Sequence, residues 1–281
     1  MRIAVTGASG RIGGQVVDLL AAGRDHDIVA ISRRAAIRAS SPAVRVAVAD
    51  YDDRSALHAA LRDVNTLVFI SSDGEAWKVL VHHQNVIAAA ARAGVSHIVA
   101  LSGLDADLDS PFCYAVTYAH TEQLLRESGC RFSIARASIY TEFLMAWLTQ
   151  ARELGQLRLP AAEGRISLVS RHDVAHCLAA LASAPPTGTE QEITGPAALD
   201  LASLTALAER VWDAPIEYVP LTPEEHRIDM ARAGEEPWWA YAYSTMFASI
   251  REQRWATVSD QVLRITGTAA ASVADVLLRA N

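Results

Sequence analysis

Three glycines near the start of the chain constrain its fold more than any other feature. Gly7, Gly10 and Gly13 follow residues 2–6, a short β-branched run that predicts a buried strand. Apolar residues at helical spacing continue over residues 11–22. The glycines therefore lie between a strand and a helix, where glycine permits a tight turn and close packing of the helix on the strand.

The next hundred residues alternate between short apolar runs and helical patterns. This alternation predicts a parallel sheet covered on both faces, and right-handed crossovers make it a doubly wound α/β sheet of the Rossmann type. A chain of 281 residues that is 51% hydrophobic can bury such a core. The predicted strands are 27–32, 44–48, 66–70, 97–101 and 132–135, and the predicted helices are 53–61, 79–93 and 114–127.

The pattern changes after about residue 155, where prolines and glycines divide the chain into shorter elements. We expect residues 1–155 to form the nucleotide-binding domain. We expect residues 156–281 to return one strand to the sheet and to form a smaller capping region over the carboxyl ends of the strands. The predicted elements of this part are helices at 171–184 and 201–212, strands at 190–194 and 216–219, and a helical region at 223–255.

Composition excludes several classes of protein. A net charge of -7 argues against a nucleic-acid partner. The sequence has no secretory signal pattern and no apolar run near the roughly 20 residues that span a bilayer, so we expect a cytoplasmic protein without a membrane partner. Three scattered cysteines predict neither disulfides nor a metal site. A small-molecule substrate is expected, and the sequence is compatible with a homo-oligomer.

The glycine turn predicts a dinucleotide cofactor. Free N–H groups and the positive end of the helix dipole at the start of a helix attract phosphates. The residues expected to cradle the diphosphate are Gly7, Ser9, Gly10, Arg11, Ile12 and Gly13.

Basic residues at the end of the second strand favour NADP(H) over NAD(H). An acidic residue there would bind the ribose 2′-hydroxyl of NAD, but the strand ends in Ser32, Arg33 and Arg34. Two guanidinium groups suit a 2′-phosphate, and Arg11 in the glycine turn is a further candidate for it. The alternative is that these arginines are ordinary surface residues.

Residues after the later strands complete the predicted cofactor site. Asp50 is placed to accept the adenine amino group, although a turn carboxylate is the alternative reading. Ile70 and Ser71 should line the ribose side, Ser102 should lie at the end of the fifth strand, and Tyr140 should flank the nicotinamide.

The chain resembles the NmrA-like group of atypical short-chain dehydrogenases/reductases, and within it the quinone-oxidoreductase type. The resemblance covers nearly the whole length and implies a Rossmann domain, a small cap, NADPH and a cleft between them. It also leaves two activities open, because some members reduce quinones or carbonyl compounds and others are NADP-binding regulators. The motifs that carry it are Gly7–Gly13, Ala49–Asp52, His83–Ile87, Thr121–Glu122, Arg171–Ala175 and Thr194–Pro196.

The resemblance also places the candidate catalytic residues. Reductases of this superfamily use Tyr-x-x-x-Lys, in which the lysine lowers the pKa of the proton-donating tyrosine. Tyr114 occupies the tyrosine position, but Tyr118 stands where the lysine would be, and the chain has a single lysine, Lys78. His120 is a candidate proton relay, with a solvent-exposed helix histidine as the alternative. For the two tyrosines the alternative is packing.

His172 and His176 lie four residues apart, but no third metal ligand is evident, so we expect no metal. Aromatic residues at 238–247 should roof the cleft over a flat substrate, with cap packing as the alternative. The leading hypothesis is an NADPH-dependent oxidoreductase that transfers hydride to a small quinone or aromatic carbonyl compound. The competing hypothesis is a non-catalytic NADP(H)-binding redox sensor of the NmrA type, which the missing lysine would favour.

Overall fold

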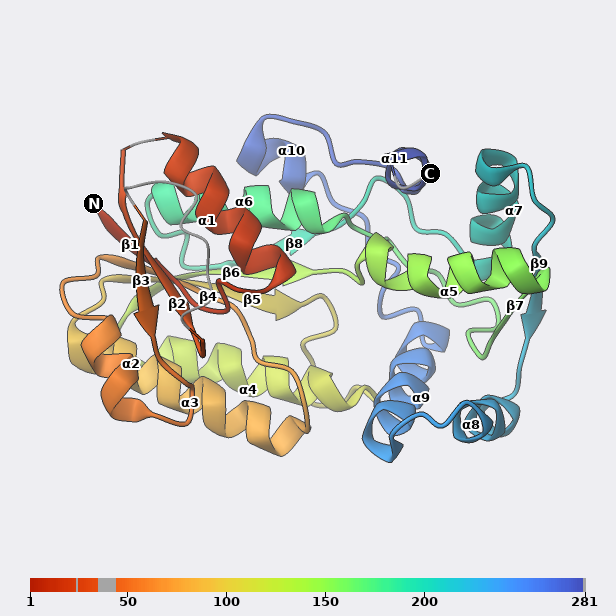
Figure 1. The fold of residues 1–281 in the computed structure, drawn as a ribbon, viewed down its shortest axis with the longest axis horizontal. Coiled ribbons are helices and arrows are strands. Elements are labelled where there is room, and N and C mark those ends of the chain that lie inside the picture. The colour runs from red at the N-terminus through yellow and green to blue at the C-terminus, as the bar shows by residue number, and fades with distance from the viewer. Residues whose placement is uncertain (24, 35–43, 280–281) are drawn as a thin grey trace.

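Seven parallel strands form the central sheet in the order β3-β2-β1-β4-β5-β6-β8 (Figure 1). The structure is a computed structural model that describes residues 1–23, 25–34 and 44–279. The order of the first six strands is that of a dinucleotide-binding sheet, so the predicted Rossmann fold is confirmed. The strands are β1 (Arg2–Val5), β2 (Asp27–Ser32), β3 (Val44–Val48), β4 (Thr66–Phe69), β5 (His97–Gly103), β6 (Arg131–Ala137) and β8 (Glu190–Ile193).

Helices cover both faces of this sheet because side chains along each strand alternate between the two faces. In β1, Ile3 and Val5 pack into one apolar core and Ala4 packs into the other. One face carries α1 (Arg11–Gly23), α6 (Arg171–Ser183) and α10 (Gln261–Thr266), and the other carries α2 (Arg54–Ala60), α3 (Ala76–Ala93) and α4 (Cys113–Glu127) (Figure 1).

The capping region has an apolar core of its own, in which Leu148, Leu204 and Phe247 are almost fully buried. It contains a separate two-stranded parallel sheet. Its elements are α5 (Thr141–Leu154), β7 (Gln156–Leu159), α7 (Leu201–Trp212), β9 (Glu217–Pro220), α8 (Pro223–Arg232), α9 (Pro237–Arg251) and α11 (Val273–Arg279).

From the second part of the chain, β8 joins the central sheet beside β6. The sequence analysis did not predict α5 or β7. The region expected to be helical at 223–255 is two helices, separated at Gly234, whose φ is +73°, and restarted at Pro237. The two cores interleave along the chain, since α5 packs in the capping core and α6 packs on the sheet. The domain boundary at residue 155 stays a prediction. Within the described residues, no helix has the length and apolar character needed to cross a membrane.

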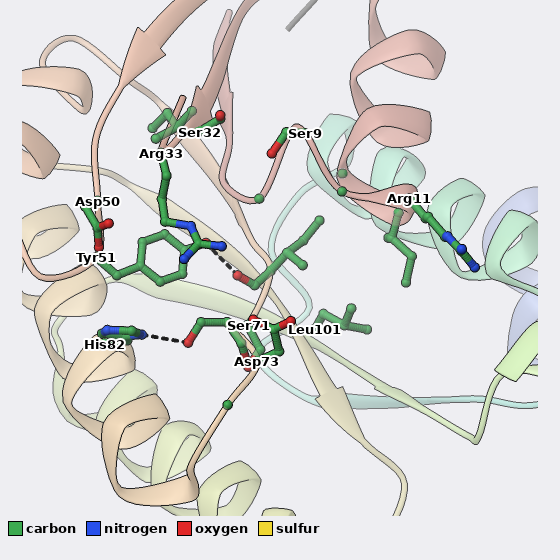
Figure 2. A pocket seen from close by; sticks show the side chains of 18 of the residues that line it. Ser9, Arg11, Ser32, Arg33, Asp50, Tyr51, Ser71, Asp73, His82 and Leu101 are labelled. Atoms are coloured by element: carbon green, nitrogen blue, oxygen red, sulfur yellow. Dashed lines mark hydrogen bonds between the residues drawn. The ribbon is translucent and has the colours of Figure 1, made fainter. Parts of the chain in front are cut away.

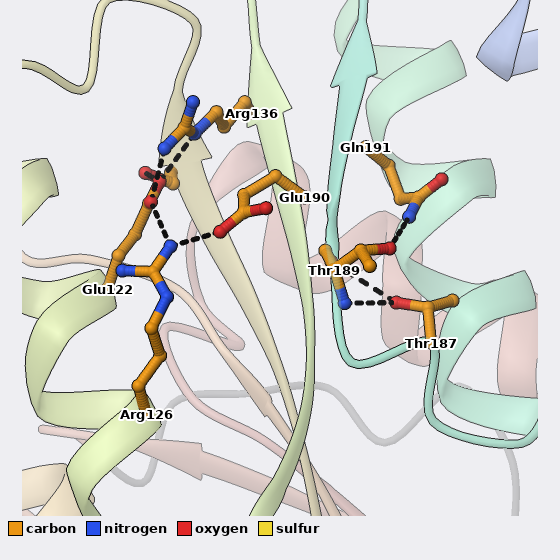
Figure 3. Close-up of polar contacts among 8 residues, drawn as sticks. Glu122, Arg126, Arg136, Thr187, Thr189, Glu190 and Gln191 are labelled. Atoms are coloured by element: carbon orange, nitrogen blue, oxygen red, sulfur yellow. Dashed lines mark hydrogen bonds and ion pairs between the residues drawn. The ribbon is translucent and has the colours of Figure 1, made fainter.

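The buried carboxylate of Glu122 connects α4 to neighbouring strands of the sheet (Figure 3). Glu122 is 1% exposed and accepts two hydrogen bonds from the Arg136 guanidinium, at 2.8 and 2.5 Å. It also accepts hydrogen bonds from the Ser102 hydroxyl at 2.8 Å and from Arg126 at 3.2 Å. Arg126 also donates a hydrogen bond to Glu190 on β8. The network thus fixes α4 against β5, β6 and β8.

Glu122→Gln should destabilise the fold by about 2–4 kcal/mol, because it removes the buried negative charge and one of the two oxygens that accept from the Arg136 guanidinium. Arg126→Ala is the matched control, since Arg126 is 43% exposed and its loss should cost about 1 kcal/mol or less. Urea unfolding of both variants measures the difference. Equal losses would show that the Glu122–Arg136 pair does not stabilise the fold as argued.

Candidate functional site

A cavity of about 750 Å³ lies at the carboxyl edge of the sheet (Figure 2). The predicted cofactor residues that line it are Gly7, Ser9, Gly10, Arg11, Ile12, Gly13, Arg33, Asp50, Ile70, Ser71 and Tyr140. The described part of the cavity wall does not include the other predicted site residues, which are Arg34, Ser102, Tyr114, Tyr118 and His120.

The glycine turn brings the start of α1 unusually close to the end of β1. Gly7 has a φ of +61°, a left-handed conformation that glycine adopts without strain. A Cβ on Gly13 would lie only 2.2 Å from the Gly7 carbonyl oxygen. The first turn of α1 carries no acidic side chain, so its free N–H groups face the cavity without a competing carboxylate. This cradle fits a diphosphate.

Away from the glycine turn, the cavity is lined by Arg33, Asp50 and Tyr51 (Figure 2). The Tyr51 hydroxyl donates a 2.7 Å hydrogen bond to the Ile70 carbonyl, and burial raises the pKa of Tyr51, so the phenol stays protonated. The Asp50 carboxylate accepts the backbone N–H of Asp52 at 3.0 Å, which is a turn contact, while Asp50 also lines the cavity. Both readings of Asp50 from the sequence are therefore compatible with its position.

The predicted arginines do not converge on one point. Arg33 lines the cavity near Tyr51, whereas Arg34 is exposed outside it and its backbone hydrogen-bonds the Ser32 hydroxyl. Figure 2 shows Arg11 on the other side of the glycine turn, with its side chain directed away from Arg33. Of the three arginines predicted to bind a 2′-phosphate, Arg33 is therefore the best placed.

Ser102 lies on the opposite face of β5 from the cavity. Its hydroxyl donates to Glu122, and the neighbouring residue Leu101 lines the cavity instead. Side chains alternate along a strand, so only one of these two neighbours can face the cofactor site. The structure therefore does not bring Ser102 to the site where the sequence analysis expected it.

Ser71 is oriented by a buried histidine. The Thr121 hydroxyl donates to the Thr117 carbonyl at 2.6 Å, so its oxygen accepts the Nδ1 proton of His83 across 2.5 Å. The His83 Nε2 atom is then an acceptor, 2.8 Å from the Ser71 hydroxyl, which also lies 2.8 Å from the Ser72 carbonyl. Burial lowers the pKa of His83 to about 3, which keeps the ring neutral. Because the Ser71 proton is donated inside the protein, Ser71 offers the cavity a hydrogen-bond acceptor.

Tyr114 lies beside the cavity rather than in its wall. Its hydroxyl donates to the carbonyl of Gly74, which does line the cavity, and its ring contacts Trp238 edge-on with ring centres 6.1 Å apart. Burial raises the pKa of Tyr114. The hydroxyl proton is therefore engaged in holding Gly74 to the start of α4.

Tyr118 and His120 have different surroundings. The Tyr118 ring packs against Gly103, where an added Cβ would lie 2.3 Å from Tyr118 Cε2, and it stacks on Tyr114. Burial raises the pKa of Tyr118, so it supplies no charge in place of the missing lysine. His120 is exposed on α4. These contacts agree with the packing alternative for Tyr118 and with the exposed alternative for His120.

Comparison with known proteins identifies the family. The NAD(P)H-binding family model matches residues 7–185, which include the glycine turn and all the described residues that line the cavity. The chain belongs to this family.

Several of the similar proteins are named oxidoreductases. Quinone oxidoreductase 2 of Escherichia coli is 36% identical over 83% of this chain and 82% of its own length. An oxidoreductase with an NmrA-like family domain from Aspergillus flavus is 34% identical over 64% of this chain and 61% of that protein. The crystal structure of the E. coli NADPH-dependent quinone oxidoreductase QOR2 with NADPH superposes with a TM-score of 0.92, at 29% identity and 99% coverage of both chains. The expected resemblance is confirmed, and this family member is an NAD(P)H-dependent oxidoreductase.

Several cavity residues were not among the site residues predicted from the sequence. Lys78, which could not be assumed to reach the site, lines the cavity from α3, and Arg171 lines it from the start of α6. Lys78 was recognisable as the single lysine of the chain, but Arg171 appeared only as part of a family motif. The position of Arg171 depends on the packing of α6 beside α1, which sequence periodicity does not reveal.

One group of potential metal ligands borders the cavity. Ligand atoms of Asp50, Asp52 and His82 lie within 4.8 Å of one another. The His82 ring already bonds Asp52 at 3.1 Å and the Ser72 hydroxyl at 2.8 Å, and the Lys78 ammonium lies 3.8 Å from Asp52. Because the protein's own groups use these atoms, the cluster is explained as a hydrogen-bonded corner of the cavity.

Gly13→Ala should raise the Kd for NADPH and NADH alike by about tenfold or more, because the new Cβ must push α1 away from the Gly7 carbonyl. Gly14→Ala is the control, since its Cβ would meet the Ala8 carbonyl oxygen at an ordinary 3.5 Å. Fluorescence titration measures both variants, and a thermal melt checks folding. Unchanged affinity in a folded Gly13→Ala protein would contradict the cradle.

Proposed function

We propose that this oxidoreductase transfers hydride from NADPH to a small quinone or aromatic carbonyl compound. The observation that carries the proposal is the division of one cavity into two chemical environments. Arg33, Lys78 and Asp50 give a charged end beside Tyr51, and Leu101, Tyr140 and Phe143 give an apolar, partly aromatic part of the same cavity. The similarity to E. coli quinone oxidoreductase 2 supports the same substrate class.

The fit of the cofactor rests on the cradle between Gly7 and Gly13, which leaves space and N–H groups for a diphosphate. Arg33 is proposed to bind the 2′-phosphate, and Ser71 to accept a hydrogen bond from a ribose hydroxyl. When bound, the cofactor supplies the hydride. The protein contributes position and exclusion of water.

The tyrosines explain why the acceptor should be strongly electrophilic. The Tyr114 proton is donated to Gly74, and the Tyr118 phenol has a pKa raised by burial. Burial likewise raises the pKa of Tyr140 to about 12. No tyrosine of this group is activated as an acid. A quinone that gains a hydride becomes a hydroquinone anion, and it can take its proton from water, whereas a simple ketone needs more help from an acid.

Arg33→Ala should raise the Kd for NADPH about 10- to 100-fold and the Kd for NADH by less than about threefold, because charge-assisted hydrogen bonds to a phosphate contribute roughly 1.5–3 kcal/mol. Arg34→Ala should have a smaller effect on NADPH, since its side chain lies outside the cavity wall. Calorimetric titration with both cofactors decides this. Equal weakening of NADPH and NADH by Arg33→Ala would mean that Arg33 supplies only a general positive field.

The substrate class is tested by mixing the protein with NADPH and a panel of quinones and simple ketones, and following the nicotinamide absorbance band. We expect turnover with quinones and little with ketones. Tyr114→Phe should lower kcat for a quinone by less than about tenfold, whereas loss of a general acid would cost about 100-fold or more. Tight NADP binding without turnover of any acceptor would favour the redox-sensor alternative.

A further inference from the structure

Two helices that lie side by side on one face of the sheet both begin with an arginine (Figure 1). Arg11 is the first residue of α1 and Arg171 is the first residue of α6. Each helix is followed by a strand parallel to the rest of the sheet, β2 for α1 and β8 for α6. Both helices therefore run antiparallel to the strands and start at the carboxyl edge of the sheet. Both arginines line the cavity there.

Arg171 is held at two points, one on its side chain and one on its backbone. The guanidinium carbon lies 5.4 Å from the centre of the Tyr140 ring, in a cation–π contact. The backbone N–H of Arg171 donates to both carboxylate oxygens of Glu142, at 3.0 and 3.1 Å. Glu142 thus satisfies the start of α6, and the Arg171 side chain extends from a fixed backbone along the cavity wall.

Neither arginine has a carboxylate partner among the residues that the structure describes. No ion pair of Arg11 or Arg171 with a described acidic residue occurs within 4.0 Å. Burial lowers the pKa of Arg171, the nearby Glu142 carboxylate opposes this shift, and the positive charge of Arg11 adds to it. Two guanidinium groups close to one another in a cavity wall are stabilised by an anion between them.

We propose that Arg11 and Arg171 together bind the diphosphate of the dinucleotide. The free N–H groups of the first turn of α1 would hold the diphosphate from the same side. Its two negative charges match the two guanidinium groups, while Arg33 remains on the other side of the glycine turn for the 2′-phosphate (Figure 2). The proposal rests on the dinucleotide site of the proposed function and is independent of the substrate.

This assignment separates two contributions to cofactor binding. Arg11 and Arg171 contribute affinity for any pyridine dinucleotide, because NADH and NADPH share the diphosphate. Arg33 contributes the preference for NADPH. The adenosine fragment 2′-AMP carries the 2′-phosphate without a diphosphate, so its binding depends on Arg33 and not on Arg171.

The test measures Kd for NADPH, NADH and 2′-AMP with Arg171→Ala, Arg171→Gln and Arg33→Ala. Arg171→Ala should raise Kd for both dinucleotides by the same factor, about tenfold or more, and leave Kd for 2′-AMP unchanged. Arg171→Gln should do the same, and it keeps a long side chain against Tyr140 if the alanine variant folds poorly. Arg33→Ala should show the reverse pattern, with losses for NADPH and 2′-AMP. Arg210→Ala, an exposed arginine on α7, controls for general charge.

The results distinguish failure of this inference from failure of the proposed function. Unchanged dinucleotide affinity in both Arg171 variants would overturn the diphosphate assignment, and a rise in the KM for quinone alone would reassign Arg171 to the substrate. A loss of 2′-AMP binding in Arg171→Gln would also overturn it. If only the pattern expected for Arg33→Ala were absent, the assignment of NADPH selectivity to Arg33 would be wrong and the diphosphate assignment would stand.

Discussion

The close approach of α1 to the end of β1 is the contact on which the site depends. Because Gly13 has no side chain, the first turn of α1 can lie against the Gly7 carbonyl, and its N–H groups point along the carboxyl edge of the sheet. The parallel sheet then places the ends of β2, β4 and β5 along the same edge. It also lets α6 pack beside α1 and bring Arg171 to the cavity wall. The cavity therefore results from two features together: the close contact between Gly13 and the Gly7 carbonyl, and the parallel direction of the strands.

Periodicity predicted the sheet because each of its strands is a local apolar run closed by turn residues. The boundaries of β2, β3 and α7 agree with the predicted residues, since their ends coincide with changes in the apolar pattern. By contrast, β7 has four residues and pairs with β9, about sixty residues later in the chain, so no local pattern marks it. Tyr140 was predicted to flank the nicotinamide, but the sequence analysis did not predict that α5 begins directly after it, with an apolar face buried in the capping core.

The site was predictable at the level of segments and less so at the level of side chains. Adjacent residues at a strand end point in different directions, so Leu101 reaches the cavity where Ser102 was expected, and Arg33 reaches it while Arg34 does not. Choosing between neighbours requires the register of the strand and the partners on its other face. For Ser102 that partner is the buried Glu122, which competes for its hydroxyl more effectively than a ligand in the cavity could.

The surroundings of Tyr118, which stands at the position of the missing lysine, do not suit a lysine. A lysine beside a catalytic tyrosine would need a polar, hydrated position, but the equivalent residue, Tyr118, packs its ring on Gly103 and stacks on Tyr114. The positive charges of the cavity lie elsewhere, at Arg11, Arg33, Lys78 and Arg171. Their arrangement suits the phosphates of a cofactor better than an alkoxide at the tyrosines. In the proposed function, these charges bind the cofactor and the tyrosines contribute little acid catalysis, which favours acceptors whose own electron affinity drives the transfer.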